Sequence, residues 1–524
     1  MENRNTEHRE KIAEFMLTPN NERAQINFYK KNVITDLSSD FTLPDYLPEI
    51  RKMLGIKAKI SPISRYIGAG NVSFSGRVDY DMIYLSAEGK LASVPLGDDF
   101  SFEVQPEIPE NIEWDTSNDA FADVETDMLH CRVTAPRKVN IKCRLRSLVR
   151  LFGYDEIGET LRELGANTEK LTTEKKCAMV HRYMSEVIEL GDEISIIGTS
   201  ENVIPLSLDA SVNILETNVN ENNLNCRGEV IARIVYENSD NGETTSTTRK
   251  MPFSQNVEID SDGNKNSPVF CNVRGTCGEI KVSSGESKLL IDTEVILEAD
   301  TIRNIPVTIT EDLFVPCCES SVQYRDFKFD TVEKCTMGTM TVTQTIPLSN
   351  LSMSQESEII DHSCYARSEN ISERDQNIYI DGNAKIWILS KEGDEFSSGE
   401  TVIPFSFNTG TSTADGKLSY SAKPTVTACH FRIEGENLLC EIDISLPYCI
   451  MREQSARIAE EASVSKESFS SLGGITIYYP EKGETLWDIA KKFSVPMRKL
   501  AEANDLPSVS AHEDISSKHY IMIY

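Results

Sequence analysis

Hydrophobic and polar residues alternate along much of this chain with a period of two. Clear examples are residues 289–299 (LLIDTEVILEA) and 437–449 (NLLCEIDISLPYC). Alternation of this kind places apolar side chains on one face of a β-strand and polar ones on the other. Polar, glycine-containing turns separate many of these runs, which is typical of β-hairpins. The pattern therefore predicts a protein built mainly of strands.

One hairpin pattern occurs three times, in residues 71–104, 223–259 and 377–409. Each copy begins with a short alternating run that ends in glycine, continues into a second run, and returns after a polar turn. The matching positions are Gly76, Gly228 and Gly382, with prolines in the returning strands at Pro95, Pro252 and Pro404. The glycines lie 152 and 154 residues apart, a register that indicates an internal repeat. A central glycine permits a bend or bulge, and proline favours an edge strand.

These hairpins and their return strands predict a mainly β fold, with tandem β-sandwich or barrel-like repeats followed by a small α+β (βααβ) domain. The predicted boundaries are 1–150 for the first repeat, 151–190 for a helical connector, 191–300 and 301–454 for the second and third repeats, 455–473 for a flexible linker, and 474–524 for the last domain.

The connector and the linker are predicted from local composition. Residues 155–190 are highly charged, and Leu161, Leu164 and Leu171 have helical spacing. Residues 455–473 begin with a helical pattern and end in a run rich in serine and glycine, which is typical of a tether.

The last fifty residues have a pattern of their own. A short alternating run predicts a strand, and Pro480 and Gly483 end it. Thr485 is placed to cap a helix with Asp488 as its capping-box partner. An apolar face follows at Leu486, Ile489, Ala490 and Phe493, a second helix ends near Asn504, and Tyr520–Tyr524 forms a closing strand.

This segment resembles the LysM family along its whole length. The matching pieces are GETLWDIAKKF, Val495, Leu500, Asn504 and Leu506. One departure is the sequence DISSKHYIMIY, which lacks the glycine that the family usually places before its last strand.

The resemblance implies a shallow groove that binds N-acetylglucosamine chains. By position, its two sides are Gly483, Glu484, Thr485 and Leu486, and Asn504, Asp505 and Leu506. The alternative is structural: Thr485 and Asn504 only cap helices, and Leu486 belongs to the core. Trp487 lies off the apolar stripe, so we expect it to be partly exposed and to anchor a partner together with Leu486 and Lys491.

The chain as a whole resembles the family of the SpoIVA-interacting protein L (SipL) of spore-forming clostridia. Residues 43–50 (LPDYLPEI) resemble a motif that opens the repeats of that family, and the C-terminal LysM segment matches its domain order. The resemblance implies a non-catalytic adaptor in spore coat assembly. It also implies that the LysM domain binds the coat ATPase, stage IV sporulation protein A, at the forespore surface inside the mother cell, and that the repeats contact other coat proteins.

The charge argues against a nucleic-acid partner. The chain has 53 Lys and Arg against 83 Asp and Glu, a formal charge of −30. A surface of this sign repels phosphate backbones. Residues 475–524 carry six basic and seven acidic side chains, so nearly all of the negative charge belongs to the repeats.

The expected location is the cytoplasm. No stretch approaches the ~20 apolar residues that a membrane-spanning helix needs, so we expect no membrane insertion. The first twenty residues lack the apolar centre of a secretory signal. Peptidoglycan lies outside the membrane, so this expectation favours a polypeptide partner over a glycan.

The chain has 13 cysteines, which in a reducing compartment are mostly small apolar core residues. Neither Cys271 with Cys277 nor Cys317 with Cys318 has the spacing of a zinc site. We therefore expect no metal and no cofactor. The chain has no GxSxG or HExxH motif and no Cys/His signature, and its acidic residues are too numerous for a catalytic pair to stand out, so we expect no enzyme activity.

Three other functions remain open at this point. The chain could be a peptidoglycan-binding protein of the cell wall, a hydrolase with a LysM targeting tail, or a hub of a phage tail or injection machine.

Overall fold

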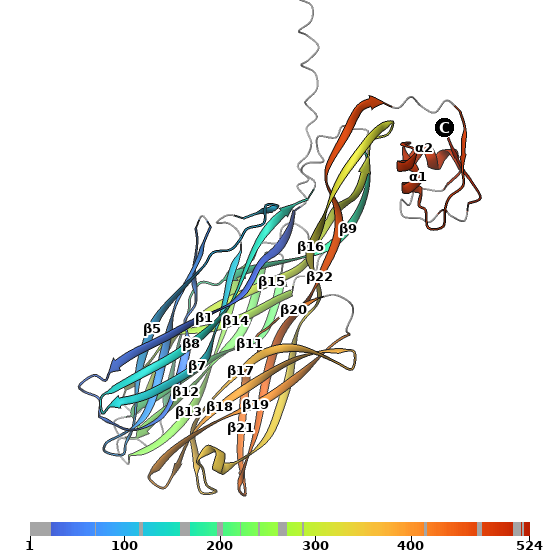
Figure 1. Cartoon of the computed structure of the whole chain (residues 1–524). Helices are drawn as coiled ribbons and strands as arrows, with labels where there is room; N and C mark the ends of the chain where they lie inside the picture. Colours follow the sequence, from blue (N-terminus) through green and yellow to red (C-terminus); the bar gives the residue numbers. More distant parts are fainter. Residues whose placement is uncertain are drawn as a thin grey trace, which may run out of the picture.

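The computed structural model describes residues 23–68, 70–114, 119–157, 168–195, 203–220, 222–238, 242–259, 270–285, 288–412, 417–468, 474–506, 515 and 518–524. Long strands dominate these residues, and the two α-helices both lie near the C-terminus (Figure 1). The predicted mainly β fold is confirmed.

The first unit is a sandwich of two antiparallel sheets. One sheet contains β1, β8, β6 and β7, and the other contains β2, β4, β3 and β5. The bounds are β1 Arg23–Thr42, β2 Ile50–Ile60, β3 Ser64–Ile67, β4 Val72–Ser86, β5 Leu91–Val104, β6 Ile112–Glu113, β7 Ala120–Ala135 and β8 Lys138–Glu156.

The second unit pairs β9 and β10 with β15 and β14, and faces a sheet of β11, β12 and β13. Its bounds are β9 Glu169–Met184, β10 Ile188–Ser195, β11 Val203–Asn220, β12 Asn223–Asn238, β13 Glu243–Glu258, β14 Phe270–Gly285 and β15 Lys288–Phe314.

The third unit pairs β16 with β22, β20 and β21, and faces a sheet of β17, β18 and β19. Its bounds are β16 Cys318–Pro347, the 3-10 helix η2 Leu348–Leu351, β17 Glu358–Arg374, β18 Asn377–Glu392, β19 Glu395–Ser412, β20 Leu418–Ala422, β21 Thr425–Glu434 and β22 Asn437–Ser468.

All three units share one strand order, so the repeat extends well beyond the hairpin seen in the sequence. In each unit the last strand (β8, β15 or β22) pairs with the first, and the hairpin strands form the opposite sheet. Alternate residues of the last strand face inward in every unit, as Ile141, Ile291 and Cys440 show. The apolar residues of the alternating sequence pattern thus form the inward face of each sandwich.

The repeated glycines each lie beside a phenylalanine of the neighbouring strand. The register pairs are Gly76 with Phe100, Gly228 with Phe253, and Gly382 with Phe405. A Cβ at Gly382 would lie 2.3 Å from the Phe405 ring and 2.3 Å from the carbonyl oxygen of Arg367. The ring covers backbone that a side chain would otherwise occupy, a known way to accommodate glycine in a sheet.

Two of the three repeated prolines occupy equivalent positions. Pro252 and Pro404 each precede the paired phenylalanine, whereas Pro95 lies opposite Asp81, further along the hairpin. All three lie on the returning strands β13, β19 and β5, which are at the edges of their sheets, where proline is tolerated. The sequence match therefore placed Pro95 on the correct strand, but this proline is not at the position equivalent to Pro252 and Pro404.

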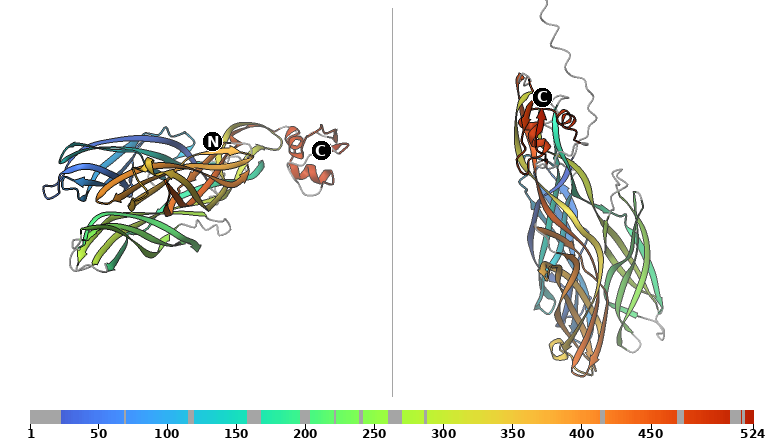
Figure 2. Two further views of the ribbon diagram at one scale, coloured as in Figure 1. Left: turned by 90° about the horizontal axis from the view of Figure 1, so that it is seen from below. Right: turned by 90° about the vertical axis from the view of Figure 1, so that its right-hand side faces the viewer.

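The three units pack against one another through shared apolar clusters. Ile83, Val235 and Leu389, at matching positions of β4, β12 and β18, belong to one cluster. Phe152, Ile302 and Met451, at matching positions of β8, β15 and β22, belong to another. Figure 2 shows the blue, green and orange units lying side by side. Contacts between equivalent positions indicate an approximate threefold arrangement.

A buried charge cluster lies at the meeting point of the units. The Asp123 carboxylate of the first unit accepts from Arg150 (2.9 Å) and Arg182 (3.0 Å) and lies within 3.1 Å of Arg274 and 2.8 Å of Lys423. Burial alone would raise the pKa of Asp123, but these four cations hold it well below its ordinary value. One carboxylate therefore links all three units.

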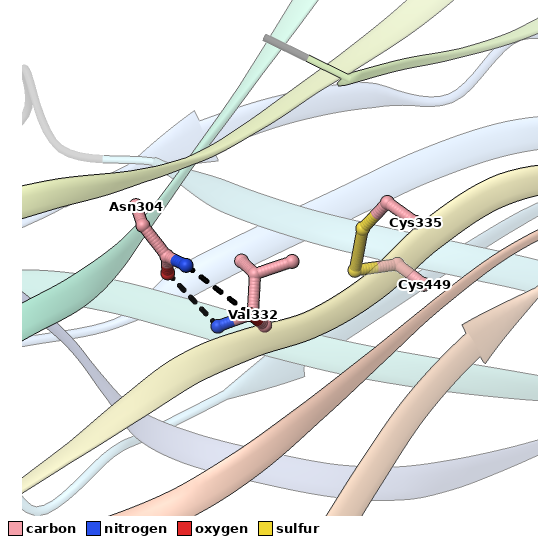
Figure 3. Close-up of a disulfide and its surroundings, with 4 residues drawn as sticks. All are labelled: Asn304, Val332, Cys335 and Cys449. Carbon is pink, nitrogen blue, oxygen red and sulfur yellow. Dashed lines mark hydrogen bonds between the residues drawn. A yellow bond between two sulfur atoms is a disulfide. The ribbon is translucent and has the colours of Figure 1, made fainter. Parts of the chain in front are cut away.

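Side-chain amides also bridge neighbouring units. Asn304 on β15 donates to the carbonyl of Val332 on β16 (3.1 Å) and accepts from its N–H (2.9 Å), as Figure 3 shows. Beside this bridge a disulfide joins Cys335 and Cys449, paired residues of β16 and β22. The other eleven cysteines are free thiols, most of them buried or half-buried.

The predicted helical connector is wrong where the structure describes it. Residues 169–184 form β9, which pairs with β15 along its length, and residues 151–156 complete β8. Leu171 lies on β9 in a stretch whose exposure alternates with a period of two. Pairing with β15 stabilises the extended conformation of this stretch over a helix. Leu161 and Leu164 fall outside the described residues.

Most of the predicted flexible linker is strand instead. β22 continues to Ser468 because the start of β16 supplies a partner for it, and only residues 469–473 fall outside the described part of the chain. β15 likewise runs through the predicted boundary at residue 300 to Phe314.

These long strands create an extension that we call the arm: β9 with the end of β15, and the start of β16 with the end of β22 (Figure 1). The C-terminal module lies beside its tip. The module contains β23 Thr476–Tyr478, α1 Leu486–Lys492, α2 Met497–Ala503 and β24 Ile521–Ile523, which confirms the predicted βααβ order.

We expect Gly382→Ala to destabilise the third unit by about 2 kcal/mol or more, because the new methyl group collides with backbone and ring atoms that cannot both move. Urea unfolding measures the loss. Gly191→Ala is the control, since a Cβ there lies 3.1 Å from the Asp292 side chain and no closer than 3.8 Å to backbone. Equal stability of the two variants would contradict this explanation of the repeated glycine.

We expect Asp123→Ala to cost about 3–5 kcal/mol, because it leaves four buried cations without their shared partner. The loss should appear in urea unfolding as a lower midpoint for the whole body. Asp99→Ala, which removes an exposed carboxylate paired only with Arg77, should change stability by less than about 1 kcal/mol. A small effect at Asp123 would show that the cluster does not hold the units together.

Candidate functional site

The C-terminal module is the candidate site that the sequence singled out, and its first helix begins as predicted. The Thr485 hydroxyl accepts from the N–H of Asp488 (3.2 Å), and the Asp488 carboxylate accepts from the N–H of Thr485 (2.9 Å). This reciprocal pair is a complete capping box. Thr485 thus has the structural role that was the alternative to glycan binding.

The remaining residues on that side of the predicted groove are also engaged. The Glu484 carboxylate accepts from the Tyr478 hydroxyl (2.9 Å) and from the N–H of Glu481 (2.8 Å). These hydrogen bonds, with Lys492, outweigh desolvation and lower the pKa of Glu484. Gly483 has φ +86°, so it turns the chain into the helix where other residues would be strained.

Asn504, on the other side of the groove, fastens the second helix to the last strand. Its amide donates to the carbonyls of Leu500 and Met522, both at 2.8 Å, and accepts from the N–H of Met522 at 2.6 Å. Asp505 follows with φ +50°, and Leu506 is half-buried against the module core. The amide of Asn504 is therefore used inside the module.

Leu486 and Trp487 are both buried, at 2% and 3% exposure. Leu486 is core, as the structural alternative had it, but the expectation of an exposed Trp487 is wrong. Its ring packs edge-on against Phe314 of β15, with centroids 5.2 Å apart, and its N–H donates to Asp312 (2.9 Å). Trp487 is an interface anchor, but the surface that it anchors to belongs to the same chain.

Lys491 lies one turn further along the same face and contacts the same carboxylate. Its ammonium donates to the two Asp312 oxygens at 2.6 and 2.8 Å and lies 3.3 Å from the Tyr324 hydroxyl. Partial burial by itself raises the pKa of Asp312, but hydrogen bonds from Lys491, Trp487 and Tyr324 lower it overall. Asp312 is therefore charged at neutral pH, and so is Lys491, whose pKa is raised.

Local sequence patterns do not single out the partners of this face. Asp312, Phe314 and Tyr324 lie on the arm, more than 160 positions before the residues that they contact. Nothing in their local pattern differs from that of the other strands. A contact between such distant segments becomes visible only in the folded chain.

The outer face of the module's small sheet is apolar and exposed. β23 and β24 pair in the register Thr476–Ile523, Ile477–Met522 and Tyr478–Ile521, with Ile521 and Ile523 turned into the core. The side chains of the opposite face are exposed: Ile475 69%, Ile477 55%, Tyr479 69%, Tyr520 50% and Tyr524 61%. We call these five residues the outer sheet face. Five exposed large side chains at the two ends of such a small domain are a candidate interaction site.

A second candidate is a hollow of about 1790 Å³ that residues of all three units line. Its ionisable groups are largely paired across units. Lys57 lies 3.0 Å from Asp361 and 3.8 Å from Asp209, and His362 contacts Arg233. Burial, with the charge of Arg233, lowers the pKa of His362 to about 3, so this imidazole is neutral at neutral pH. The pairing supports a role in holding the units together.

The comparisons with known proteins agree with this architecture. A family model described as SipL, SPOCS domain, matches residues 201–283, and a LysM domain model matches residues 481–510. The chain contains a SipL-type SPOCS domain and a LysM domain. No curated protein and no solved structure matches the chain.

The SPOCS match lies within the second unit, from the start of β11 into β14. The first and third units have the same strand order, so the fold repeats this architecture on either side of the matched segment. The two domains together indicate a scaffold that is related to sporulation or binds peptidoglycan. Within the described residues, neither short LysM helix has the length or apolar character to cross a bilayer.

We expect Asn504→Ala to destabilise the LysM domain by about 2–3 kcal/mol, because the backbone groups of Met522 and Leu500 lose their partners. Hydrogen exchange of β24 amides in the full chain measures this local loss. Arg498→Ala, which removes an exposed side chain paired with Glu502, is the control and should leave exchange unchanged. Unaltered protection of the β24 amides in the Asn504 variant would show that Asn504 does not hold β24 in place, and would leave its side chain available to a ligand in the groove.

Proposed function

We propose that this chain is a non-catalytic scaffold of spore coat assembly. In this proposal its LysM domain binds a polypeptide, the coat ATPase stage IV sporulation protein A, at the forespore surface in the mother cell. The SPOCS repeats form the body that presents the LysM domain and contacts other coat proteins. The SPOCS and LysM matches support the sporulation setting.

The observation that carries the choice of a polypeptide is the contrast between two surfaces of the LysM domain. In the groove, the polar side chains of Glu484, Thr485 and Asn504 already have partners within the domain. The outer sheet face instead offers two isoleucines and three tyrosines to solvent. Tyrosine and large aliphatic side chains bury well against protein and supply much of the energy of protein interfaces.

The charge distribution also suits this division of roles. Residues 475–524 are nearly neutral, with six basic and seven acidic side chains, while the body carries most of the −30 charge. A partner therefore meets little electrostatic repulsion at the LysM domain. The strongly acidic body favours solubility and discourages close approach of a second copy.

Peptidoglycan binding is the second candidate, and the LysM match itself supports it. A glycan bound in the groove would have to use backbone groups there, or displace the internal hydrogen bonds of Glu484 and Asn504.

A pull-down with purified stage IV sporulation protein A tests the proposal. Ile477→Asp in the full chain should weaken capture about tenfold or more, because a charge replaces an apolar anchor at the centre of the outer sheet face. Stability should change little, since Ile477 is 55% exposed. The matched control is Ile34→Asp, an equally exposed isoleucine (51%) on β1 of the body.

Pelleting with purified peptidoglycan, done with the same three proteins, separates the candidates. Capture of the ATPase by the wild type and the Ile34 variant, with loss in the Ile477 variant, supports the proposal. Firm binding to peptidoglycan without capture of the ATPase would reject it.

A further inference from the structure

The tip of the arm carries a compact surface that fits one face of the LysM domain. Its residues are Asp312 and Phe314 at the end of β15, Val315, and Cys318 and Tyr324 on β16, and we call them the arm-tip surface. The LysM residues opposite are Trp487 and Lys491 on α1 and Ser494 just after it.

The contact combines burial with directional hydrogen bonds. Phe314 is 2% exposed and belongs to the same apolar cluster as the LysM core. Asp312 accepts from both Trp487 and Lys491, so one carboxylate fixes two points of α1. The Asp312 side chain is partly buried, at 17% exposure, so its ion pair with Lys491 is less screened by solvent than a fully exposed one.

Groups just after the C-terminal end of α1 add a further anchor. The N–H of Cys317 donates to the carbonyl of Ser494 (2.9 Å), and the Ser494 hydroxyl lies 3.2 Å from the carbonyl oxygen of Cys318. Cys317 and Ser494 both have positive φ, 61° and 53°. Ser494 follows the C-cap of α1, where a left-handed residue commonly ends a helix, and the Val495 N–H closes this turn on the Ala490 carbonyl (2.9 Å).

From these contacts we infer that the arm-tip surface is a receptor for the chain's own LysM domain. It holds α1 by Trp487 and Lys491 and so fixes the domain in one orientation at the end of the body. The short connection between Ser468 and Gly474 keeps the two surfaces at high effective concentration, so a contact of modest intrinsic affinity is enough to keep them together.

The consequence for recognition rests on the proposed function. The five residues of the outer sheet face keep their 50–69% exposure while α1 is held against the arm. Docking therefore leaves that face open to a partner. It also fixes the orientation of the LysM domain in advance, so less entropy is lost when a partner binds. Trp487 and Lys491 were predicted to contact a partner protein. In the structure they contact the arm of the same chain instead.

Disulfide trapping in the full chain tests the docked arrangement without any partner. Ser494→Cys places a thiol beside Cys317, which is exposed, and Cys318. With oxidised glutathione, peptide mapping should find the introduced thiol joined to one of these cysteines about tenfold faster than in the control. The control is Arg498→Cys, whose native side chain is 87% exposed and pairs only with Glu502.

Adding Asp312→Ala to the Ser494 variant should slow trapping about tenfold, because Trp487 and Lys491 lose their common acceptor. Trp487→Ala should act in the same direction. Equal trapping rates at positions 494 and 498, or rates unaffected by Asp312→Ala, would overturn the inference.

Capture of the ATPase by the trapped protein tests the docking inference together with the proposed function, and its outcomes show which of the two has failed. If the outer sheet face is the binding surface, the trapped and untrapped proteins should capture the ATPase equally. Loss of capture on trapping would mean that the partner needs the α1 face, which overturns the orienting role. If no variant captures the ATPase, the proposed function fails, while the trapping rates still decide whether the domain docks.

Discussion

Where the three units meet, buried charges that all three contribute neutralise one another beside shared apolar clusters. Asp123 alone accepts from cations of all three units, and Arg182 reaches both Asp123 and Asp300 (2.5 Å). Removing one unit while these charges stay buried would leave ions without a partner, at a cost of several kcal/mol for each. The relative placement of the three units therefore includes a charge constraint as well as apolar packing.

The arm is a consequence of strand length. β15, β16 and β22 are much longer than a sandwich needs, and they continue as paired ribbons beyond the shared core. Their tip is then the one region of the body that the LysM domain contacts among the described residues. A rigid sheet extension holds a binding domain more precisely than a tether does, because paired strands resist bending.

The sequence predicted what local periodicity controls. The mainly β fold, the repeat marked by its three glycines, and the capped first helix of the LysM domain were all accessible, since each depends on neighbours in sequence or on the pleat. The stretch around Leu171 was misread as helical because its strand partner, β15, lies more than a hundred residues away. The burial of Trp487 was missed for the same reason, because Phe314 and Asp312, which contact it, lie more than 170 residues earlier in the chain.

One site in the fold shows how far the repeats have diverged. One cross-strand pair lies at the same place in each unit: Lys30–Arg150 in the first, Arg182–Asp300 in the second and Cys335–Cys449 in the third. This place is two residues before Phe152, Ile302 and Met451, which pack together where the units meet. The first pair is like-charged, the second is an ion pair and the third is a covalent bond. The same position of the repeat therefore carries different chemistry in each unit. Exchanging one unit for another would bring a different pair to the place where the three units meet, so the units are not interchangeable there.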